Sequence, residues 1–406
     1  MKLRTLAALA AMMCVLLPVA PFQPAEAHPG VNGRIAFGSR REGTAYEIVS
    51  MNTDGSDQVV LTTGEGGPNF PDWSPDGSMI AFSSDKGSLA YEIWVMEDDG
   101  SNPTQVTDQG GNDYDPSWSP DGTRIAFTGR SGTDYDIFTM DPDGSDVVNV
   151  TNSPGVYETT PAWSPDGRRI AFSSDRKDPA LDIYSIKTNG SGLTRLTTSP
   201  KTDLLPAWAP SGGRIAFRRG EEGRSEIFTI RADGTGERQL TNNAAKDDHP
   251  AWSPDGSKIV FTSHRTGGFD IWVMNADGSG AEDLTSNFAG PDQIPSWQPL
   301  CTQIGTDGPD VLTGTAGVDV LCGFGGDDEL MGLGGNDVLL GGDGNDTISG
   351  GDGSDVSAGG LGDDTISGEA GDDRLNVRDE ITGNDTVRGG LGNDVCIHDA
   401  GDVVHC

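Results

Sequence analysis

Aspartate residues recur at intervals of nine through much of the last hundred positions of this 406-residue chain. Each is the sixth residue of a unit that begins with glycine, and residues 341–349 read Gly-Gly-Asp-Gly-Asn-Asp-Thr-Ile-Ser. Glycine lets backbone carbonyls converge at little steric cost, and the aspartate brings a carboxylate to the same place. Because calcium takes six to eight oxygen ligands, such a loop has the chemistry of part of a calcium site.

One loop cannot supply a full set of ligands. Two nine-residue units make one coil, so loops two units apart stack and several Ca²⁺ ions could each lie between stacked loops. The candidate metal ligands are Asp310, Asp319, Asp328, Asp337, Asp346, Asp355, Asp364, Asp373, Asp385 and Asp394. The alternative is that these residues only cap turns, where Asp and Gly are common. Strict recurrence beside an aliphatic residue argues against that alternative.

The eighth position of each unit predicts a short strand with one inward side chain. These positions hold Leu312, Leu321, Leu330, Leu339, Ile348, Ile366, Leu375 and Val387. Ser357 breaks the pattern and predicts a weak coil, and residues 377–382 interrupt the tract. The pattern predicts a parallel β-roll over residues 300–406, and residues 305–397 resemble the RTX, or haemolysin-type, calcium-binding repeat.

The strong negative charge of this segment indicates that its folding depends on calcium. From residue 300 onward the chain has 22 acidic and 3 basic residues. Without calcium these carboxylates repel one another, and a thin apolar stripe cannot offset the entropy of the ordered chain. We expect the segment to be disordered in low calcium and folded at extracellular calcium, where such modules bind with Kd of about 10⁻⁴ to 10⁻³ M.

A second repeat system precedes the first, with a period of about 45 residues. Tryptophan recurs at Trp73, Trp118, Trp163, Trp208, Trp252 and Trp297. Most of these open a Trp-Ser-Pro-Asp-Gly motif, followed by an apolar triplet such as Ile80-Ala81-Phe82, an acidic-apolar-aromatic strand, and an Asp-Gly or Asn-Gly turn typical of tight hairpins. Each unit reads as four short antiparallel strands. Six units predict a β-propeller, with the tryptophans as core anchors between sheets.

The ends of this region also fit a ring. The first unit lacks its opening strand, and the last tryptophan motif has no unit after it. If residues 295–297 pair with the first unit, the ring closes and leaves no open sheet edge. Residues 31–299 resemble the TolB-type propeller repeat, and this resemblance implies a protein-binding scaffold of the bacterial envelope.

The N-terminus predicts export. Residues 1–27 contain Lys2 and Arg4, an apolar run and an Ala25-Glu26-Ala27 cleavage site, as in a secretory signal peptide cleaved after about Ala27. A membrane anchor fits less well, because the run is short and interrupted by proline. We expect a secreted, extracellular or cell-surface bacterial protein with no transmembrane segment in its mature chain.

Four cysteines remain after the signal peptide, all near the C-terminus. Their number is even and the expected compartment is oxidising, which favours disulfides. Three connectivities are possible. We favour Cys301–Cys322 and Cys396–Cys406, because each pair would staple one end of the roll; buried free thiols are the alternative.

No catalytic constellation is evident. The chain has no Gly-x-Ser-x-Gly elbow followed by an α/β domain. Only His249 and His264 lie within the propeller repeats, and we interpret His249 as a lone polar residue facing the channel. The formal net charge of -36 excludes nucleic acid as an expected partner.

Together these patterns predict an all-β protein with three parts. They are a signal peptide (1–27), a six-bladed β-propeller (28–299) and an RTX-type parallel β-roll (300–406). The expected function is a secreted, non-enzymatic calcium-binding protein whose propeller recognises a protein or cell-wall partner at its face or channel. The alternative is a secreted hydrolase or lyase that acts on a polymer at the channel.

Overall fold

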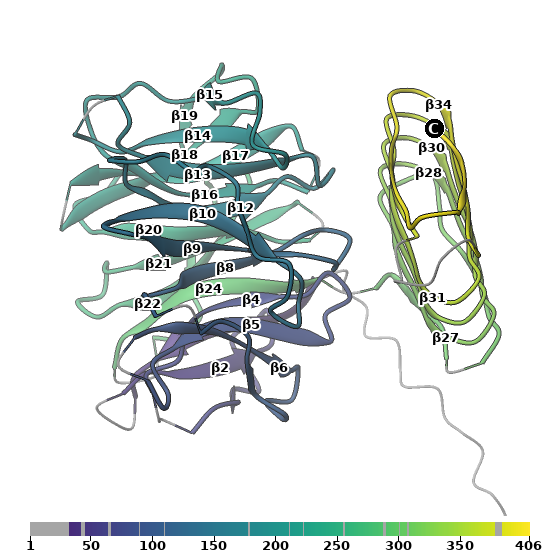
Figure 1. The fold of residues 1–406 in the computed structure, drawn as a ribbon. Helices are drawn as coiled ribbons and strands as arrows, with labels where there is room; N and C mark the ends of the chain where they lie inside the picture. The colour runs from purple at the N-terminus through teal and green to yellow at the C-terminus, as the bar shows by residue number, and fades with distance from the viewer. Residues whose placement is uncertain are drawn as a thin grey trace, which may run out of the picture. The chain divides into compact units, whose positions relative to one another are not determined.

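The computed structural model describes residues 32–406 except 42–44, 64–65, 89, 109, 178, 211, 222, 255, 287–289, 300, 307 and 378–383. The predicted signal peptide lies outside the described residues. The secondary structure of the described part is entirely β, which confirms the predicted all-β class of a six-bladed propeller and a parallel β-roll (Figure 1). No helix long and apolar enough to cross a membrane occurs in this described part.

Six four-stranded antiparallel sheets form the blades of the propeller. In the first blade the order is β24 (Asp292–Pro299), β1 (Asn32–Ser39), β2 (Glu47–Met51) and β3 (Val59–Val60). The second and third blades contain β4 (Asn69–Trp73), β5 (Met79–Ser84), β6 (Glu92–Glu97) and β7 (Thr104–Gln105), then β8 (Tyr114–Trp118), β9 (Ile125–Ser131), β10 (Asp134–Met140) and β11 (Val148–Asn149).

The remaining three blades repeat this arrangement. The fourth contains β12 (Glu158–Trp163), β13 (Arg169–Ser174), β14 (Asp182–Lys187) and β15 (Thr194–Arg195). The fifth contains β16 (Asp203–Trp208), β17 (Arg214–Glu221), β18 (Arg224–Arg231) and β19 (Arg238–Gln239). The sixth contains β20 (Asp247–Trp252), β21 (Lys258–Ser263), β22 (Asp270–Asn275) and β23 (Glu282–Asp283).

The apolar triplets hold neighbouring blades together. Strands covered on both faces are apolar without alternation, and all three residues of Ile80-Ala81-Phe82 are buried. Trp73 packs with Ala36 and Ile48 of the preceding blade, so the tryptophans are core anchors between sheets, as predicted. The ring closes where β24 pairs with β1, with Ile35 opposite Trp297, which confirms the expected closure.

The hairpin glycines have the backbone geometry that their turns require. Gly55 has φ of 82° and Gly144 has φ of 87°, in the left-handed region that favours glycine. An added Cβ at Gly144 would also meet the backbone carbonyl of Val106 in the preceding blade. These turns therefore fix both the hairpin and the distance between blades.

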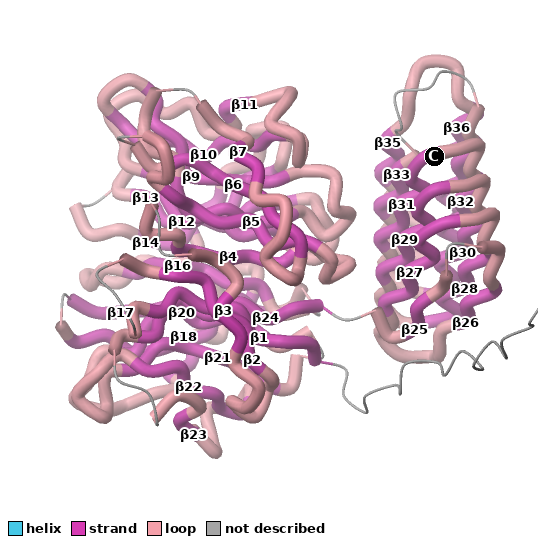
Figure 2. Tube along the Cα trace, turned by 90° about the horizontal axis from the view of Figure 1, so that it is seen from below, coloured by secondary structure: helices cyan, strands magenta, loops and turns pink. Residues whose placement is uncertain are grey.

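The roll consists of two parallel six-stranded sheets, which Figure 2 shows as two rows of strands. One sheet contains β25 (Gln303–Ile304), β27 (Val320–Gly325), β29 (Val338–Asp343), β31 (Val356–Leu361), β33 (Arg374–Asn376) and β35 (Val395–Ile397). The other contains β26 (Val311–Thr313), β28 (Glu329–Gly334), β30 (Thr347–Asp352), β32 (Thr365–Ala370), β34 (Thr386–Leu391) and β36 (Val403–His405).

Consecutive coils stack in the register that the repeat predicts. Leu321 lies opposite Leu339, which is two nine-residue units further along the chain. The inward side chains form one buried aliphatic stripe, consisting of Leu312, Leu321, Leu330, Leu339, Ile348, Ile366, Leu375, Val377 and Val387. Ser357 occupies an inward position between Leu339 and Leu375 and is fully buried, with an Oγ that has no hydrogen-bond partner.

The interruption of the repeat begins later than the sequence suggested. Val377 was assigned to the break, but it is fully buried in the stripe, and its N–H donates to the carbonyl of Ile397 at 2.9 Å. Across the interruption the register continues with a longer step, because Thr365 pairs with Thr386. The step is three residues longer than in the regular coils, and Val387 still lies opposite Ile366 on the stripe.

Both favoured disulfides are present. Cys301 and Cys322 are joined with a Cα–Cα distance of 5.8 Å, and Cys396 and Cys406 with one of 6.3 Å. Cys322 is buried at the first complete coil, whereas Cys396 packs against the last part of the aliphatic stripe. The prediction of one staple at each end of the roll is confirmed.

Candidate metal centre and propeller channel

The sixth-position aspartates form a ladder along the roll. The backbone N–H of Asp337 donates to Oδ1 of Asp355 at 2.8 Å. Equivalent bonds join Asp310 to Asp328, Asp319 to Asp337, Asp328 to Asp346, Asp346 to Asp364, Asp355 to Asp373, Asp364 to Asp385 and Asp373 to Asp394. One carboxylate oxygen thus holds the preceding coil in place, so part of the turn-capping alternative is correct.

The second carboxylate oxygen is different. Oδ2 is buried without a hydrogen-bond partner in Asp328, Asp337, Asp355 and Asp373. Each of these side chains is at most 3% exposed. A buried carboxylate oxygen with no partner is costly, so these loops favour a cation or a proton at that position.

A glycine in each unit keeps open the space that Oδ2 faces. A Cβ added to Gly332 would lie 2.5 Å from Oδ2 of Asp337 and closer still to the carbonyl oxygen of Gly350. A Cβ on Gly350 would lie 2.9 Å from the carbonyl oxygen of Gly368 and closer to Oδ2 of Asp355. Carboxylate and carbonyl oxygens therefore converge at a point that only glycine leaves vacant, and oxygen ligands of both kinds suit calcium.

The electrostatics of the ladder agree with this geometry. The pKa of Asp337 is raised to about 7, mainly by burial and also by the neighbouring carboxylates of Asp355 and Asp319, against the lowering effect of the backbone hydrogen bond. Burial likewise raises the pKa of Asp355 and of Asp373 to about 6. Among the described residues no basic side chain lowers the pKa of Asp337 or Asp355, whereas Arg168 partly offsets the rise at Asp373.

The first two candidates in the chain are arranged differently. Oδ2 of Asp310 accepts hydrogen bonds from the N–H of Thr306 at 2.6 Å and from its Oγ1 at 2.8 Å. Oδ2 of Asp319 accepts the same pair of bonds from Thr315. Threonine thus satisfies the oxygen that is unpartnered in the later loops, and these two aspartates are the weakest candidate ligands.

The roll extends beyond the units recognised in the sequence. Strand β25 precedes the first unit, and Thr302 donates through Oγ1 to Oδ1 of Asp319 at 3.2 Å. Strand β36 follows the last unit and places Val404 opposite Val387 on the stripe. This brings Asp402 to the position of a sixth-residue aspartate, which the Gly401-Asp402 pair before an apolar run could have indicated.

Each glycine-rich loop contains one sixth-position aspartate, and the aspartates of neighbouring loops come from different coils. Within the described ranges no three side chains of His, Cys, Asp or Glu come close enough to hold a metal ion together. A cation bound here would therefore take many of its oxygens from backbone carbonyls, as the glycine-rich loops allow.

The propeller channel is lined by one unusual residue from each blade. The six innermost strands contain a non-glycine residue with φ between 49° and 59°, at Phe70, Asp115, Thr160, Leu205, His249 and Ile294. All six line one cavity along the channel, and the rings of Phe70 and His249 are 6.4 Å apart across it. Such backbone conformations cost about 1–3 kcal/mol each, and they aim these six side chains at the channel.

His249 lacks the partners of a general base. Burial lowers its pKa, and Lys246 and Arg218 lower it further, although Asp248 acts in the opposite direction. Nδ1 of His249 lies 3.8 Å from Asp248, beyond hydrogen-bond distance, while Lys246 contacts Asp248 at 2.7 Å. The carboxylate is committed to basic side chains, so the histidine is a neutral channel residue.

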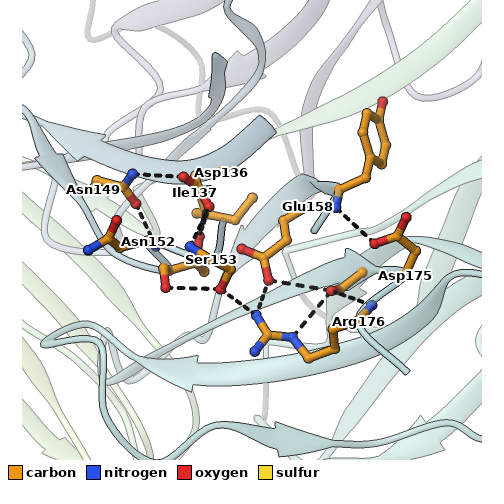
Figure 3. A network of polar contacts seen from close by, with 11 residues as sticks. Asp136, Ile137, Asn149, Asn152, Ser153, Glu158, Asp175 and Arg176 are labelled. Atoms are coloured by element: carbon orange, nitrogen blue, oxygen red, sulfur yellow. Dashed lines mark hydrogen bonds and ion pairs between the residues drawn. The ribbon is translucent and has the colours of Figure 1, made fainter. Parts of the chain in front are cut away.

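Buried acidic residues join adjacent blades, as Figure 3 shows. Glu158 at the start of β12 pairs with Arg176, whose Nη2 also donates to Ser153 at 3.0 Å. The backbone N–H of Ser153 in turn donates to Asp136 of the preceding blade at 3.0 Å. Equivalent arginine–acid pairs join Arg41 to Asp292, Arg219 to Asp203 and Arg265 to Asp247.

The junction of the second and third blades has acids but no such arginine among the described residues. Asp113 occupies the place of Glu158 there, and its buried Oδ2 has no hydrogen-bond partner. Burial raises the pKa of Asp113 to about 7, with a further contribution from Glu92. Arg130 lies nearby on β9, but its Nε donates to the carbonyl of Gly132.

Comparison with known families now assigns both regions. The model of the TolB beta propeller domain matches residues 30–205 and 200–304. The chain belongs to the TolB β-propeller family. The model of the RTX calcium-binding nonapeptide repeat matches the C-terminal part of the same chain four times, at residues 304–339, 323–357, 349–378 and 382–403. Both predicted resemblances are confirmed, and the C-terminal repeats are of a calcium-binding type.

Solved structures resemble the TolB-type propeller. TolB from Acinetobacter baumannii is 25% identical with a TM-score of 0.60, over 67% of this chain and 68% of that one. A putative TolB from Agrobacterium tumefaciens is 24% identical with a TM-score of 0.53, over 64% of this chain and 91% of that one. Hydrazine synthase from Kuenenia stuttgartiensis, at 16% identity and a TM-score of 0.56 over 66% and 47%, shares the fold alone. No curated protein matches the chain.

Proposed function

We propose that this chain is an exported, non-enzymatic recognition protein whose C-terminal roll folds on binding several calcium ions. In this proposal residues 28–299 and 300–406 are separate domains, and residues 1–27 direct secretion to the cell surface or beyond. The ligands are the sixth-position aspartates from Asp328 onward, with Asp310 and Asp319 contributing least because threonines satisfy them.

One observation carries the calcium assignment. In successive loops a buried, unpartnered Oδ2 and a glycine carbonyl face the same point, as at Asp337 and Gly350. A calcium ion placed there would neutralise carboxylates that the chain leaves uncompensated and would join coils two units apart. Its binding free energy would therefore contribute to the stability of the folded roll.

A calcium titration of the full chain tests this assignment. Circular dichroism and equilibrium calcium binding are measured on the wild type and on a variant with Asp328, Asp337, Asp355 and Asp373 changed to Asn. We expect the wild type to gain β-structure with calcium and the variant to lose most of the binding. The control is Asp327→Asn, the same change at the exposed fifth position, which should leave binding intact. Equal calcium binding by the fourfold variant would contradict the assignment.

The proposed role of the propeller is recognition of a protein or cell-envelope partner. Its channel presents two apolar side chains, a phenylalanine, an aspartate, a threonine and a neutral histidine, each from a different blade. This mixture provides contacts of several kinds without a nucleophile and base in contact, which supports binding over hydrolysis or lyase chemistry. Binding assays with purified envelope proteins and with cell-wall fragments, each with and without the propeller, test this role.

A further inference from the structure

Four tyrosines form a continuous row across three blades of the propeller. The ring centroids are 5.2 Å apart for Tyr91 and Tyr114, 6.4 Å for Tyr114 and Tyr135, and 5.5 Å for Tyr135 and Tyr157. We call these four residues the tyrosine row. Tyr114 and Tyr157 lie at the start of the inner strands β8 and β12, and Tyr91 and Tyr135 at the start of the third strands β6 and β10. This end of the blades is opposite the Trp-Ser-Pro turns, because β8 begins at Tyr114 and ends at Trp118.

The repeat pattern does not require this row. The residue before the acidic position of the third strand is Tyr46, Tyr91 or Tyr135 in the first three blades, but Leu181, Ser225 and Phe269 in the others. Tyrosine is therefore concentrated on one side of the ring. A fold requirement would apply to all six blades, so the asymmetry points to a role other than folding.

The row is rigid and accessible. Tyr157 is 43% exposed, and the other three side chains are half-buried. The backbone N–H of Tyr91 donates to Asn112 and that of Tyr157 donates to Asp175, while a β-bridge links Tyr135 to Tyr157. Tyrosine held in this way supplies contact area at low entropic cost, and it is enriched in the energetically dominant part of interfaces.

Several acidic residues and an exposed arginine lie beside the row, since Arg130 is opposite Tyr135 where β9 pairs with β10. Asp85 lies near Tyr91, and Asp115 lies near Tyr114 and Tyr157. The pKa of Tyr114 is raised to about 12, mainly by burial and also by the adjacent tyrosines and Asp115. The blade junction without an arginine also lies here, since Asp113 precedes Tyr114 and Glu92 follows Tyr91. Negative ring faces beside carboxylates attract cations.

The propeller itself shows which group suits these rings. The guanidinium of Arg40 lies 5.5 Å above the ring of Tyr46, and Arg219 and Arg265 lie over aromatic rings in their own blades. Among the described contacts no lysine or arginine lies over the four rings of the tyrosine row. Its rings are therefore available to a cation from outside the chain.

From this arrangement we propose that the tyrosine row binds an extended, positively charged segment of a partner protein. Alternate side chains of an extended chain lie about 6.6 Å apart on one face, close to the spacing of the rings, so successive arginines or lysines would each meet one ring. The inference rests on the proposed recognition role and names the partner's chemistry. Surrounding carboxylates favour a cationic peptide over a neutral glycan.

The experiment uses the calcium-loaded full chain and a short peptide in which arginine and threonine alternate. Titration calorimetry compares the wild type with a variant carrying Tyr114→Ala and Tyr135→Ala. We expect an affinity loss of about 30-fold, because each cation–ring contact contributes about a factor of five to ten. The pair Tyr114→Phe and Tyr135→Phe keeps both rings and should bind within about twofold of the wild type. Binding should also weaken as salt rises.

Phe269→Ala is the matched control, since Phe269 occupies the position of Tyr135 in a blade outside the row. It should bind the peptide as the wild type does. Unchanged binding by the alanine pair, no binding by the wild type, or tyrosine-dependent binding of a neutral chitin oligosaccharide instead of the peptide would each overturn the inference. Calcium-induced folding is recorded on the same samples, so failure of the tyrosine row is separable from failure of the calcium role.

Discussion

Replacing Asp337 by asparagine should have opposite effects with and without calcium. Asparagine keeps the oxygen that accepts the backbone N–H of Asp319 and replaces the unpartnered Oδ2 by a neutral NH₂ group. That group and the carbonyl of Gly350 both border the space beside Gly332. The variant therefore mimics the protonated aspartate and removes one anionic ligand.

The size of the stability change without calcium follows from the pKa of Asp337, which rises from 3.8 to about 7. A folded-state pKa above the unfolded value means that the calcium-free roll is stabilised by protonation below about pH 4 and loses this stability as the pH rises through about 7. The difference corresponds to about 4 kcal/mol at 1.36 kcal/mol per pH unit, which we halve for solvent screening. Asp337→Asn should therefore stabilise the calcium-free roll by about 2 kcal/mol at pH 7.5 and by nothing measurable at pH 4.

The assay is urea unfolding of the full chain, followed by circular dichroism in chelator and in saturating calcium. In calcium the order reverses, and the variant should be less stable than the wild type because it has lost a ligand. Calcium should also bind more weakly at pH 5 than at pH 7.5 and release protons on binding. A variant that is less stable than the wild type in chelator at pH 7.5 would refute the reasoning, since it would mean that the chain itself compensates this charge.

Three further changes test other parts of the structure. Gly350→Ala places a methyl group against two oxygens, so it should destabilise the roll by about 2–3 kcal/mol and remove a calcium site. Gly317→Ala is the control, because a Cβ there lies 3.7 Å from its nearest neighbour. It should have neither effect in the same calcium titration. Ser357→Val should raise the free energy of unfolding of the roll by about 1–2 kcal/mol, because it replaces a buried, unpartnered hydroxyl with apolar surface. A lower free energy of unfolding would show that the coil cannot accept the larger side chain. Arg176→Met should lower propeller stability by about 3 kcal/mol at pH 7 by leaving Glu158 buried without its partner, and adding Glu158→Gln should recover much of that loss in thermal unfolding.

Sequence periodicity was sufficient to predict both folds. The recurring Ile-Ala-Phe triplets and tryptophans specify burial on both faces of a blade, and Gly144 and its equivalents specify the hairpins. The inward residue of each nonapeptide likewise specifies the aliphatic stripe of the roll. These features repeat because each unit must pack against an almost identical neighbour.

What the sequence could not show depends on contacts between units. The nine-residue pattern treats Asp319 and Asp337 alike, yet Thr315 satisfies only the former. The second residue of the unit decides this, and it lies outside the part of the pattern that repeats strictly. The left-handed residues of the channel were also missed, because no local signal distinguishes Leu205 from an ordinary strand residue. The tyrosine row joins residues of three blades and has no signature in any single repeat.

The propeller and the roll also differ in the source of the positive charge that compensates their buried carboxylates. At four blade junctions the chain provides an arginine, as Arg219 does for Asp203. In the roll Asp328 and Asp355 face open loops with none. Because an uncompensated buried charge is costly, the stability of the roll must depend on an ion from the solvent far more than that of the propeller. Removal of calcium should therefore unfold the roll at concentrations of denaturant that leave the blades intact, and the recognition surface would persist after the roll is lost.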